Sequence, residues 1–330
     1  MSTLAWVVGR GGLLGSCVER SLEASAWRPQ RPLAWRDPVP LAESIADAVS
    51  GFAARLAGGA FEDWCVCWCA GDGVVGTPAD RLDAETASLR LLLERLGNAL
   101  DRAGLALPGR FFLASSAGGV YGGCRERPLT EATPPRPISA YGRAKLDQEE
   151  TLRAWAHARP TVSVLVGRLS NVYGPGQHLD KPQGLISHMS RCLIFGVPVH
   201  IFVPLDTIRD YLFAEDAGER IVAGLERLRR ESPGGGLYVT KVLGSERETT
   251  VAALVGVFRR IAKRQLRVVA GPHPVRAQQP ARLQFRSTVW ADEPARPTTQ
   301  LLDGVSRVHR HQLALFQAGR LPAPSAGTPR

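Results

Sequence analysis

The feature that most constrains the fold is a short apolar run followed at once by regularly spaced glycines. The run precedes Gly9, Gly12 and Gly15, and a helical pattern starts directly after them, in the segment LAWVVGRGGLLGSCVERSLEAS. A strand, a tight turn and a helix in this order present helix N-terminal amides to the pyrophosphate of a dinucleotide. A glycine-rich turn without a ligand is the alternative interpretation. The order of the three elements favours a dinucleotide site.

Tyr141 and Lys145 are four residues apart in the segment SAYGRAKLDQEE. This spacing puts the phenol and the ammonium on one face of a predicted helix, for which Ser139 is the predicted N-cap. A tyrosine has a pKa of about 10 in water, and a neighbouring ammonium favours its ionised form. Such a pair can exchange a proton with a substrate hydroxyl. An amphipathic helix with a half-buried tyrosine gives the same spacing, so the surrounding motifs decide.

Seven segments occur in the order found in one enzyme family. They are VVGRGGLLG, WCVCWCAGDGVVG, FFLASSAGGVYG, PISAYGRAKLDQE, VGRLSNVYGPGQ, GLISHMSRCLIFGVPVHIF and TIRDYLFAEDAGERI. Together they resemble an extended short-chain dehydrogenase/reductase of the NAD-dependent epimerase/dehydratase family, whose best-known members act on nucleotide sugars. The resemblance runs from about residue 4 to about Leu302. It implies an α/β fold, with a doubly wound parallel sheet (Rossmann fold) and a smaller C-terminal substrate lobe.

Strand-like and helical patterns alternate through about residue 172, as expected for a parallel sheet covered by helices. We expect residues 1–172 to form the dinucleotide-binding Rossmann domain. Residues 173–320 should form mainly the substrate lobe, with residues 208–242 returning to the Rossmann core. Residues 321–330 combine Pro, Ala and Ser without periodicity, which predicts a disordered tail.

The charge of the chain restricts its partners. The formal net charge is +10, but the basic residues are dispersed and form no long run with interleaved aromatics. Nucleic acid is therefore not an expected partner, whereas a dispersed positive field attracts anionic nucleotides. No segment is long and apolar enough to cross a bilayer, and no secretory signal is recognised. We expect a cytoplasmic protein without a membrane partner.

Three alternating cysteines, Cys65, Cys67 and Cys69, raise the question of a metal site. Alternate residues of a strand are roughly 6.5 Å apart. Two thiolates on one zinc ion cannot be more than about 4.6 Å apart, so one strand cannot chelate with all three. We predict no metal site and interpret these cysteines as reduced thiols in a buried central strand.

The family resemblance implies a set of cofactor contacts, in which Lys145 holds the nicotinamide ribose and Tyr141 is the acid or base. The expected cofactor-binding residues are Gly9, Arg10, Gly12, Leu13, Leu14, Gly15, Arg36, Ala70, Gly71, Tyr141 and Lys145.

The choice between NAD and NADP depends on the segment RPLAWRDP, which we expect at the end of the second strand. An acid there would bind the ribose diol of NAD, and an arginine would pair with the 2′-phosphate of NADP. Trp35, Arg36 and Asp37 follow one another, so a shift of one residue changes the prediction. We expect NADP or NAD. NADP is favoured because Arg36 matches the basic residue of relatives and Arg10 offers a second phosphate ligand; the alternative is that both arginines are solvated.

The catalytic hydroxyl departs from the family pattern. Relatives usually place Ser or Thr four residues before the tyrosine of the VYG segment, and counting back from Tyr121 gives Ala117. The neighbouring Ser116 is our candidate for a third catalytic residue, although consecutive strand residues point to opposite faces. The alternative is that this serine only ends a strand. Dehydratases of the family carry an Asp-Glu pair next, where this chain has Gly118 and Gly119, so dehydration is disfavoured.

The resemblance also implies substrate contacts and an activity. The expected substrate-binding residues are Ala117, Asn171, Gln177, Leu185 and Arg209, of which the asparagine and the arginine match positions that contact a diphosphate in relatives. A nucleotide-sugar epimerase acting through a transient keto sugar is the first hypothesis. An NADPH-dependent reductase of a keto sugar or other carbonyl compound is the second, and a nucleotide-binding scaffold or sensor with little turnover is the third. The family further implies a homodimer, formed by the helix that carries the tyrosine and the helix before it.

Overall fold

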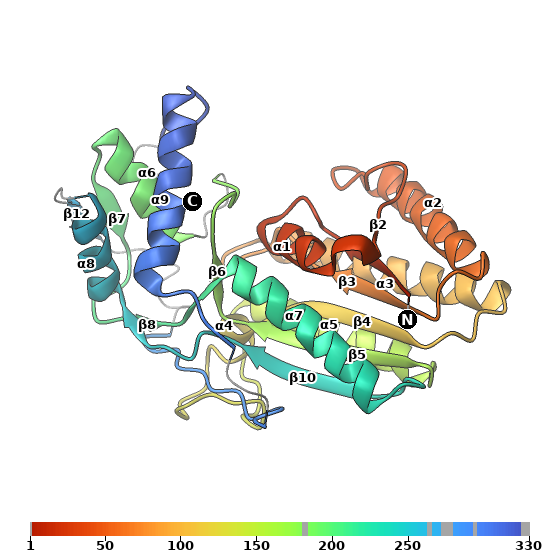
Figure 1. The fold of residues 1–330 in the computed structure, drawn as a ribbon. Helices are drawn as coiled ribbons and strands as arrows, with labels where there is room; N and C mark the ends of the chain where they lie inside the picture. Colours follow the sequence, from red (N-terminus) through yellow and green to blue (C-terminus); the bar gives the residue numbers. More distant parts are fainter. Residues whose placement is uncertain (1, 180–183, 263–265, 272–279, 293–295, 325–330) are drawn as a thin grey trace.

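A computed structural model describes residues 2–179, 184–262, 266–271, 280–292 and 296–324. It contains a six-stranded sheet with helices on both faces and a smaller lobe beside it (Figure 1). The strands of this sheet are β1 (Thr3–Val8), β2 (Ala26–Trp27), β3 (Asp63–Trp68), β4 (Gly109–Ser116), β5 (Val162–Leu169) and β10 (Tyr238–Leu243). Their spatial order is β10-β5-β4-β3-β1-β2, and every pairing is parallel. The predicted doubly wound parallel sheet is confirmed.

Helices cover both faces of this sheet. One face is covered by α1 (Leu13–Leu22) and α7 (Ala214–Glu231), and the other by α2 (Pro38–Ala57), α3 (Ala79–Arg102) and α5 (Ala140–His157). The short elements η1 (Glu23–Ser25) and α4 (Ala117–Val120) follow α1 and β4. Among the described residues, no helix is both long enough and apolar enough to cross a bilayer.

The two faces of the sheet carry side chains of different size. On β3, Cys65 and Cys67 face α1 and α7, whereas Trp68 faces α2 and α3, as strand alternation requires. The face with the small side chains is the one covered by α1 and α7, and these two helices pack closely against each other. A Cβ added to Gly218 of α7 would lie only 2.8 Å from the carbonyl carbon of Cys17 in α1.

The cysteines of β3 are core residues. Cys65 and Cys67 are buried, and their Sγ atoms are 3.8 Å apart. The hydrogen bond to Cys65, together with burial, raises the pKa of the Cys67 thiol, so this thiol is protonated at neutral pH. Within the described ranges, no group of three or more His, Cys, Asp or Glu side chains is placed to hold a metal ion.

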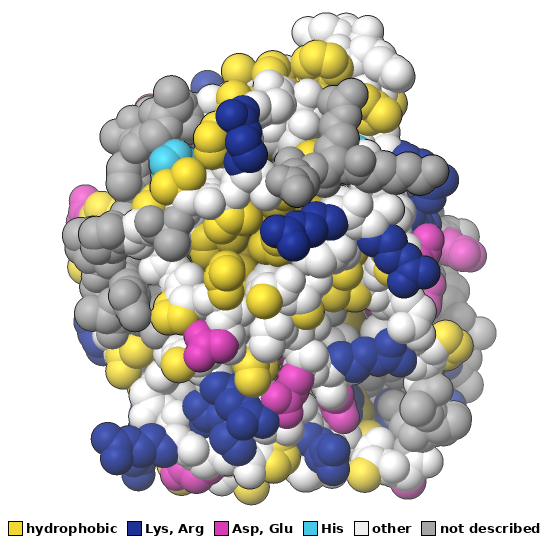
Figure 2. All heavy atoms as spheres, turned by 90° about the vertical axis from the view of Figure 1, so that its left-hand side faces the viewer, with side chains coloured by type: hydrophobic (Ala, Val, Ile, Leu, Met, Phe, Trp, Pro, Cys, Tyr) yellow, Lys and Arg dark blue, Asp and Glu magenta, His cyan; other side chains and the backbone are white. Residues whose placement is uncertain are grey.

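The lobe consists of short strand pairs and three helices. The pairs are β6 (Asn171–Tyr173) with β9 (Tyr211–Phe213), β8 (Ile208–Arg209) with β11 (Thr249–Thr250), and β7 (Val199–Ile201) with β12 (Val268–Ala270). The helices are α6 (Leu185–Phe195), α8 (Val251–Ala262) and α9 (Leu301–Gln317). Met189, Leu254 and Val305, one from each helix, are buried in its core. Figure 2 shows the molecule from the side of the lobe. Hydrophobic side chains gather near the middle of this face, with Lys and Arg side chains around them.

The chain leaves the sheet after β5 and later returns to it. β10 pairs with β5, with Tyr238 opposite Val164, and α7 packs against α1. The segment containing these two elements therefore lies with the sheet, while α8 and α9 lie with the lobe (Figure 1). Near the C-terminus Leu321 is buried, and residues 325–330 of the expected disordered tail lie outside the described residues.

The position of the second strand is corrected by the structure. β2 is Ala26–Trp27, and the segment RPLAWRDP that we expected at its end runs through the connection to α2 and ends at Pro38, the first residue of that helix. Trp27 holds β2 in place through edge contacts with Trp6 and Phe52, at ring-centroid distances of 5.6 and 5.4 Å. Pro29 follows β2 closely, and a proline cannot donate a ladder hydrogen bond. Arg36 therefore lies in a turn rather than at a strand end.

Candidate active site

The glycine-rich turn lies where the strand order of the sheet reverses. β2 lies on one side of β1 and β3 on the other, and doubly wound sheets bind ligands in the crevice at the carboxyl ends of such strands. Gly9 follows β1, and Ala70 lies in the loop after β3. A Cβ added to Gly9 would be 2.6 Å from the backbone nitrogen of Ala70. The structure thus brings these two predicted cofactor residues into contact.

The glycines of the turn fit the pyrophosphate of a dinucleotide. Gly9 has a φ of 87°, which favours glycine, and a Cβ on Gly15 would be 2.3 Å from the Gly9 carbonyl oxygen. Around Gly11, by contrast, the Cβ position is open. Gly12 precedes α1 without a side-chain cap, and the first turn of α1 contains no acidic residue. Its N–H groups and the positive end of the helix dipole can therefore face an anion.

Two arginines near this turn pair with one carboxylate. Glu19 of α1 accepts hydrogen bonds from Arg28, with an Nε to Oε1 distance of 2.9 Å, and from Arg10 at 3.4 Å. Arg36 is exposed, and its side chain forms no ion pair or hydrogen bond with the residues that the structure describes. Asp37, the acidic alternative, accepts a hydrogen bond from the Val39 N–H at 3.1 Å and caps α2.

The predicted start of the tyrosine helix is confirmed. Ser139 is the N-cap of α5 and accepts a hydrogen bond from the Gly142 N–H at 3.1 Å. A Cβ on Gly142 would lie 2.2 Å from the carbonyl oxygen of Gly119, so α5 packs directly on α4. This contact brings the first turn of α5, with Tyr141, to the end of β4.

Ser116 ends β4 and shares a hydrogen bond with Tyr141. Its Oγ also accepts a hydrogen bond from the Gly119 N–H at 3.2 Å, as the N-cap of α4. Burial raises the pKa of Tyr141 to about 12, although the hydrogen bond with Ser116 acts in the opposite direction. The tyrosine is therefore neutral at pH 7 in this state, and a hydroxyl stands beside it.

Ala117 points away from this pair. Its side chain is fully buried in a cluster with Val120, Tyr121, Leu283 and other apolar residues. The substrate contact of Ala117 stays a prediction. The backbone turns from strand to helix between residues 116 and 117, so the hydroxyl that faces Tyr141 belongs to residue 116 in this chain.

Lys145 lies one turn after Tyr141 and is buried. Its Nζ donates hydrogen bonds to Gln148 Oε1 at 3.0 Å and to the Ala114 carbonyl oxygen at 3.4 Å. The same Nζ lies 5.8 Å from the centre of the Tyr141 ring, and it is 3.7 Å from the position of a Cβ added to Gly71. Lys145 therefore links the tyrosine to the predicted cofactor loop after β3.

A buried ionic network next to Ser116, Tyr141 and Lys145 was not predicted from the sequence. Arg168 of β5 binds both carboxylate oxygens of Glu149, at 3.0 and 2.7 Å, and donates to the Tyr121 hydroxyl at 2.6 Å. Ser115 also donates to Glu149, at 2.5 Å. Glu149 lies one turn after Lys145, and the acidic pair that ends SAYGRAKLDQEE was the available signal. The network ties α5 to the strands that carry the catalytic candidates.

The two predicted diphosphate contacts lie in neighbouring strands. The Asn171 side chain donates to the Asp210 carbonyl oxygen at 2.8 Å, which brings it next to Arg209. Burial lowers the pKa of Arg209, whose guanidinium is near Tyr211. The carboxylate of Asp210 accepts hydrogen bonds from the Ser245 N–H and hydroxyl at 2.8 and 3.0 Å.

The remaining predicted substrate residues meet at the start of α6. Gln177 Oε1 accepts a hydrogen bond from the Ser187 hydroxyl at 2.8 Å, and Leu185 packs against the lobe core. A Cβ on Gly184 would be 2.7 Å from the Gln177 amide nitrogen. The structure thus brings Gln177 and Leu185 together.

Residues 67–239 match the model of the NAD dependent epimerase/dehydratase family. The chain belongs to this family. The matching region starts within β3 and ends within β10, and it includes Ser116, Tyr141 and Lys145. In sequence and fold the chain is an extended short-chain dehydrogenase/reductase, as its motifs predict.

Curated relatives match parts of the chain. The dTDP-L-rhamnose 4-epimerase of Burkholderia thailandensis is 40% identical over 99 residues, which cover 29% of this chain and 27% of the relative. UDP-glucose 4-epimerase 4 of Oryza sativa subsp. japonica is 28% identical over 172 residues, covering 48% and 46%. The dTDP-4-dehydro-6-deoxyglucose reductase of Escherichia coli is 32% identical over 117 residues, covering 36% of each. The chain spans less than half the length of each of these relatives.

Solved structures match over nearly the whole chain. A UDP-glucose 4-epimerase from Stenotrophomonas maltophila with bound NAD and formylated UDP-arabinopyranose has a TM-score of 0.74 at 20% identity, covering 95% of this chain and 99% of that one. The UDP-glucose 4-epimerase of Thermotoga maritima with UDP-glucose has a TM-score of 0.73 at 21% identity, covering 94% and 99%. At these identities the likeness concerns the fold.

Proposed function

We propose that the protein is a nucleotide-sugar epimerase, which oxidises a sugar hydroxyl to a transient ketone and returns hydride to the opposite face. The observation that carries this proposal is the hydrogen bond between Ser116 and Tyr141, with Lys145 one turn away. The glycine-rich turn lies at the same edge of the sheet and connects to this group through Ala70 and the loop after β3. Two of the relatives named above are 4-epimerases.

The proposed chemistry assigns one proton transfer to Tyr141. As phenolate it takes the proton of the sugar hydroxyl, and as phenol it returns a proton when the ketone is reduced. Ser116 holds the reacting oxygen by hydrogen bonding. Because burial raises the pKa of Tyr141 to about 12, the oxidation step requires nearby positive charge, which Lys145 supplies. A bound nicotinamide cofactor supplies the hydride chemistry.

Dehydration fits the site less well than epimerisation. Elimination of water needs additional groups that donate and accept protons next to the hydroxyl residue. In this chain α4 begins with Ala117, Gly118 and Gly119, which carry no titratable side chain. The substrate we propose is a nucleoside-diphosphate sugar, whose phosphates Asn171 and the partly buried Arg209 would bind.

An NADPH-dependent reductase is the second candidate. Its support is that Tyr141 is neutral in this structure, which is the form that donates a proton to a ketone, and that one relative is a keto-sugar reductase. A scaffold or sensor with little turnover is the third candidate, and the grouping of Ser116, Tyr141 and Lys145 opposes it.

We propose NADP as the favoured cofactor, with NAD as the alternative. Arg36 is exposed in the turn before α2 and carries a guanidinium that a 2′-phosphate can bind. Arg10, the second proposed phosphate ligand, would have to exchange its exposed contact with Glu19 for the phosphate.

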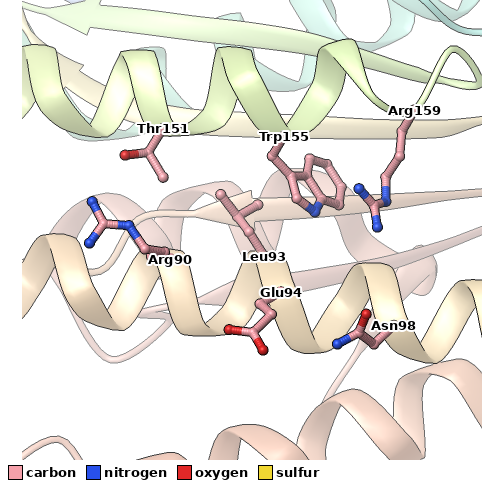
Figure 3. Close-up of a pocket in the computed structure, with 7 residues that line it drawn as sticks. All are labelled: Arg90, Leu93, Glu94, Asn98, Thr151, Trp155 and Arg159. Atoms are coloured by element: carbon pink, nitrogen blue, oxygen red, sulfur yellow. The ribbon is translucent and has the colours of Figure 1, made fainter.

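We also propose a homodimer formed by α3 and α5. These helices lie side by side and enclose a shallow groove (Figure 3). Leu93 of α3 points toward Trp155 of α5, and Glu94 also lines the groove (Figure 3). The Trp155 indole Nε1 is buried without a hydrogen-bond partner among the described residues. A second copy placed about a twofold axis would pair the same helices with themselves.

The experiment that tests the activity is a survey of UDP-, GDP- and dTDP-sugars with the purified protein. Products are identified by NMR, and the redox state of the nicotinamide is followed by absorbance. An epimerase converts the sugar without net use of cofactor, whereas a reductase consumes one reduced cofactor per turnover. A failure of every nucleotide sugar to react would contradict both assignments.

A further inference from the structure

Glu85 of α3 is an acidic side chain at the catalytic edge of the sheet that the proposed chemistry does not use. Its Oε1 accepts hydrogen bonds from the backbone N–H groups of Asp72 and Gly73, both at 2.6 Å. These residues belong to the loop after β3, which also contains Gly71. The carboxylate therefore fixes this loop to α3.

The second carboxylate oxygen of Glu85 and the ammonium of Lys145 both lie near Gly71. A Cβ added to Gly71 would lie 3.2 Å from Glu85 Oε2 and 3.7 Å from Lys145 Nζ. The acidic and basic side chains thus flank the same point of the loop, from α3 and α5.

We propose that Glu85 is a positioning residue that anchors the loop of Gly71 to Gly73 beside Tyr141 and offsets the positive charge of Lys145 there. The inference rests on the proposed nicotinamide chemistry. It assigns the two oxygens of one carboxylate different roles: Oε1 holds the loop that borders the cofactor site, and Oε2 places negative charge at that site.

The charge of Glu85 acts on Tyr141. Burial is the largest cause of the raised pKa of Tyr141, and the field of Glu85 raises it further. The other groups that act on or lie near the phenol are Ser116 at the end of β4 and Lys145 on its own helix, whose Nζ is 5.8 Å from the centre of the ring. The exposed loop residue Asp72, next to Gly71, pairs with Arg81 at 3.6 Å. The Glu85 carboxylate therefore favours the protonated form of Tyr141. It also favours oxidised nicotinamide, whose ring is positively charged, over reduced nicotinamide.

A purely structural role is the competing interpretation, because Oε1 alone would hold the loop. Glu85→Gln separates the two roles. The amide oxygen can still accept from Asp72 and Gly73, and the side chain keeps its size, but the negative charge is lost. Glu85→Ala removes both roles. Glu62→Gln is a matched control, since Glu62 is an exposed carboxylate just before the amino end of β3, at the opposite edge of the sheet.

The test measures dissociation constants of NAD+ and NADH, and of NADP+ and NADPH, for the four proteins by fluorescence titration. For Glu85→Gln we expect the ratio of oxidised to reduced dissociation constants to rise roughly three- to tenfold, as expected from losing one charge within several ångströms at an intermediate dielectric constant. The pH at which turnover of a sugar alcohol reaches half its maximum should also fall, because phenolate forms more readily. Glu62→Gln should match the wild type in both measurements.

An unchanged ratio in Glu85→Gln, with weaker binding only in Glu85→Ala, would overturn the proposal and leave a loop anchor. Unchanged binding in both variants would overturn the anchor as well. If the wild type bound none of the four dinucleotides, the proposed function itself would fail. If only the role of Glu85 fails, the wild type still binds the dinucleotides, and Glu85→Gln leaves the ratio of oxidised to reduced dissociation constants unchanged.

Discussion

Ser116 has two roles in the structure, as the N-cap of α4 and as the hydrogen-bond partner of Tyr141. Both depend on the backbone turning from strand to helix directly after this residue. In a continued strand Ser116 and Ala117 would point to opposite faces, and the family spacing would place Ala117 at the reacting oxygen. Sequence spacing identified the two candidates, but the direction of each side chain depends on a turn that spacing does not encode.

Substitutions of Ser116 and of Ala117 should therefore have different effects on turnover. Ser116→Ala should lower turnover on the order of 10²-fold, the scale of losing one donor at a reacting oxygen. Ala117→Ser should not raise turnover, since the added hydroxyl enters the apolar cluster of Val120 and Leu283. Burying that hydroxyl should lower the free energy of unfolding by about 1–3 kcal/mol. Steady-state kinetics and thermal unfolding of both variants measure these effects, and higher turnover in Ala117→Ser would refute the placement.

At the scale of elements, the strands, the tyrosine helix and the glycine-rich turn were predictable because each has a local signal. The apolar runs of β3 and β5 mark strands buried on both faces, and Ser139 marks the start of α5. β2 was not predictable in the same way. It has only the two residues Ala26 and Trp27, and its position depends on Trp27 packing against Trp6 and Phe52, which are distant in the sequence.

The corrected position of β2 sharpens the cofactor prediction. Arg36 lies in an exposed turn before α2, while Arg28 follows β2 directly and is held by Glu19. If Arg36 binds the 2′-phosphate, Arg36→Ala should weaken NADP(H) binding about tenfold or more, the scale of a lost charge-assisted hydrogen bond, with little effect on NAD(H). Arg259→Ala, an exposed arginine of the lobe helix α8, is the matched control, because Arg28 itself lies at the end of β2. Calorimetric titration with the four dinucleotides measures the effect, and equal losses for NADP(H) and NAD(H) would retire the NADP assignment.

At the scale of the whole molecule, the proposed homodimer would place α3 and α5 between two copies. Small-angle scattering over a wide range of concentrations should give the mass of two chains. Glu94→Arg, in the groove of Figure 3, should shift the protein toward the monomer, because a twofold contact repeats each reversed charge. Wild-type protein that stays monomeric at every concentration would contradict this arrangement.

The central claim is that the chain exchanges hydride between a nucleotide sugar and a bound nicotinamide, with Tyr141 as the acid or base. Rapid mixing of the cofactor-loaded protein with the nucleotide sugar that reacts best, followed at the absorbance band of reduced nicotinamide, tests this claim most directly. Wild-type protein should show a transient change in that band. Tyr141→Phe should bind the cofactor equally well but show the change at a rate lower by roughly two orders of magnitude or more. An equal rate in both proteins, or no change with any nucleotide sugar, would contradict the claim.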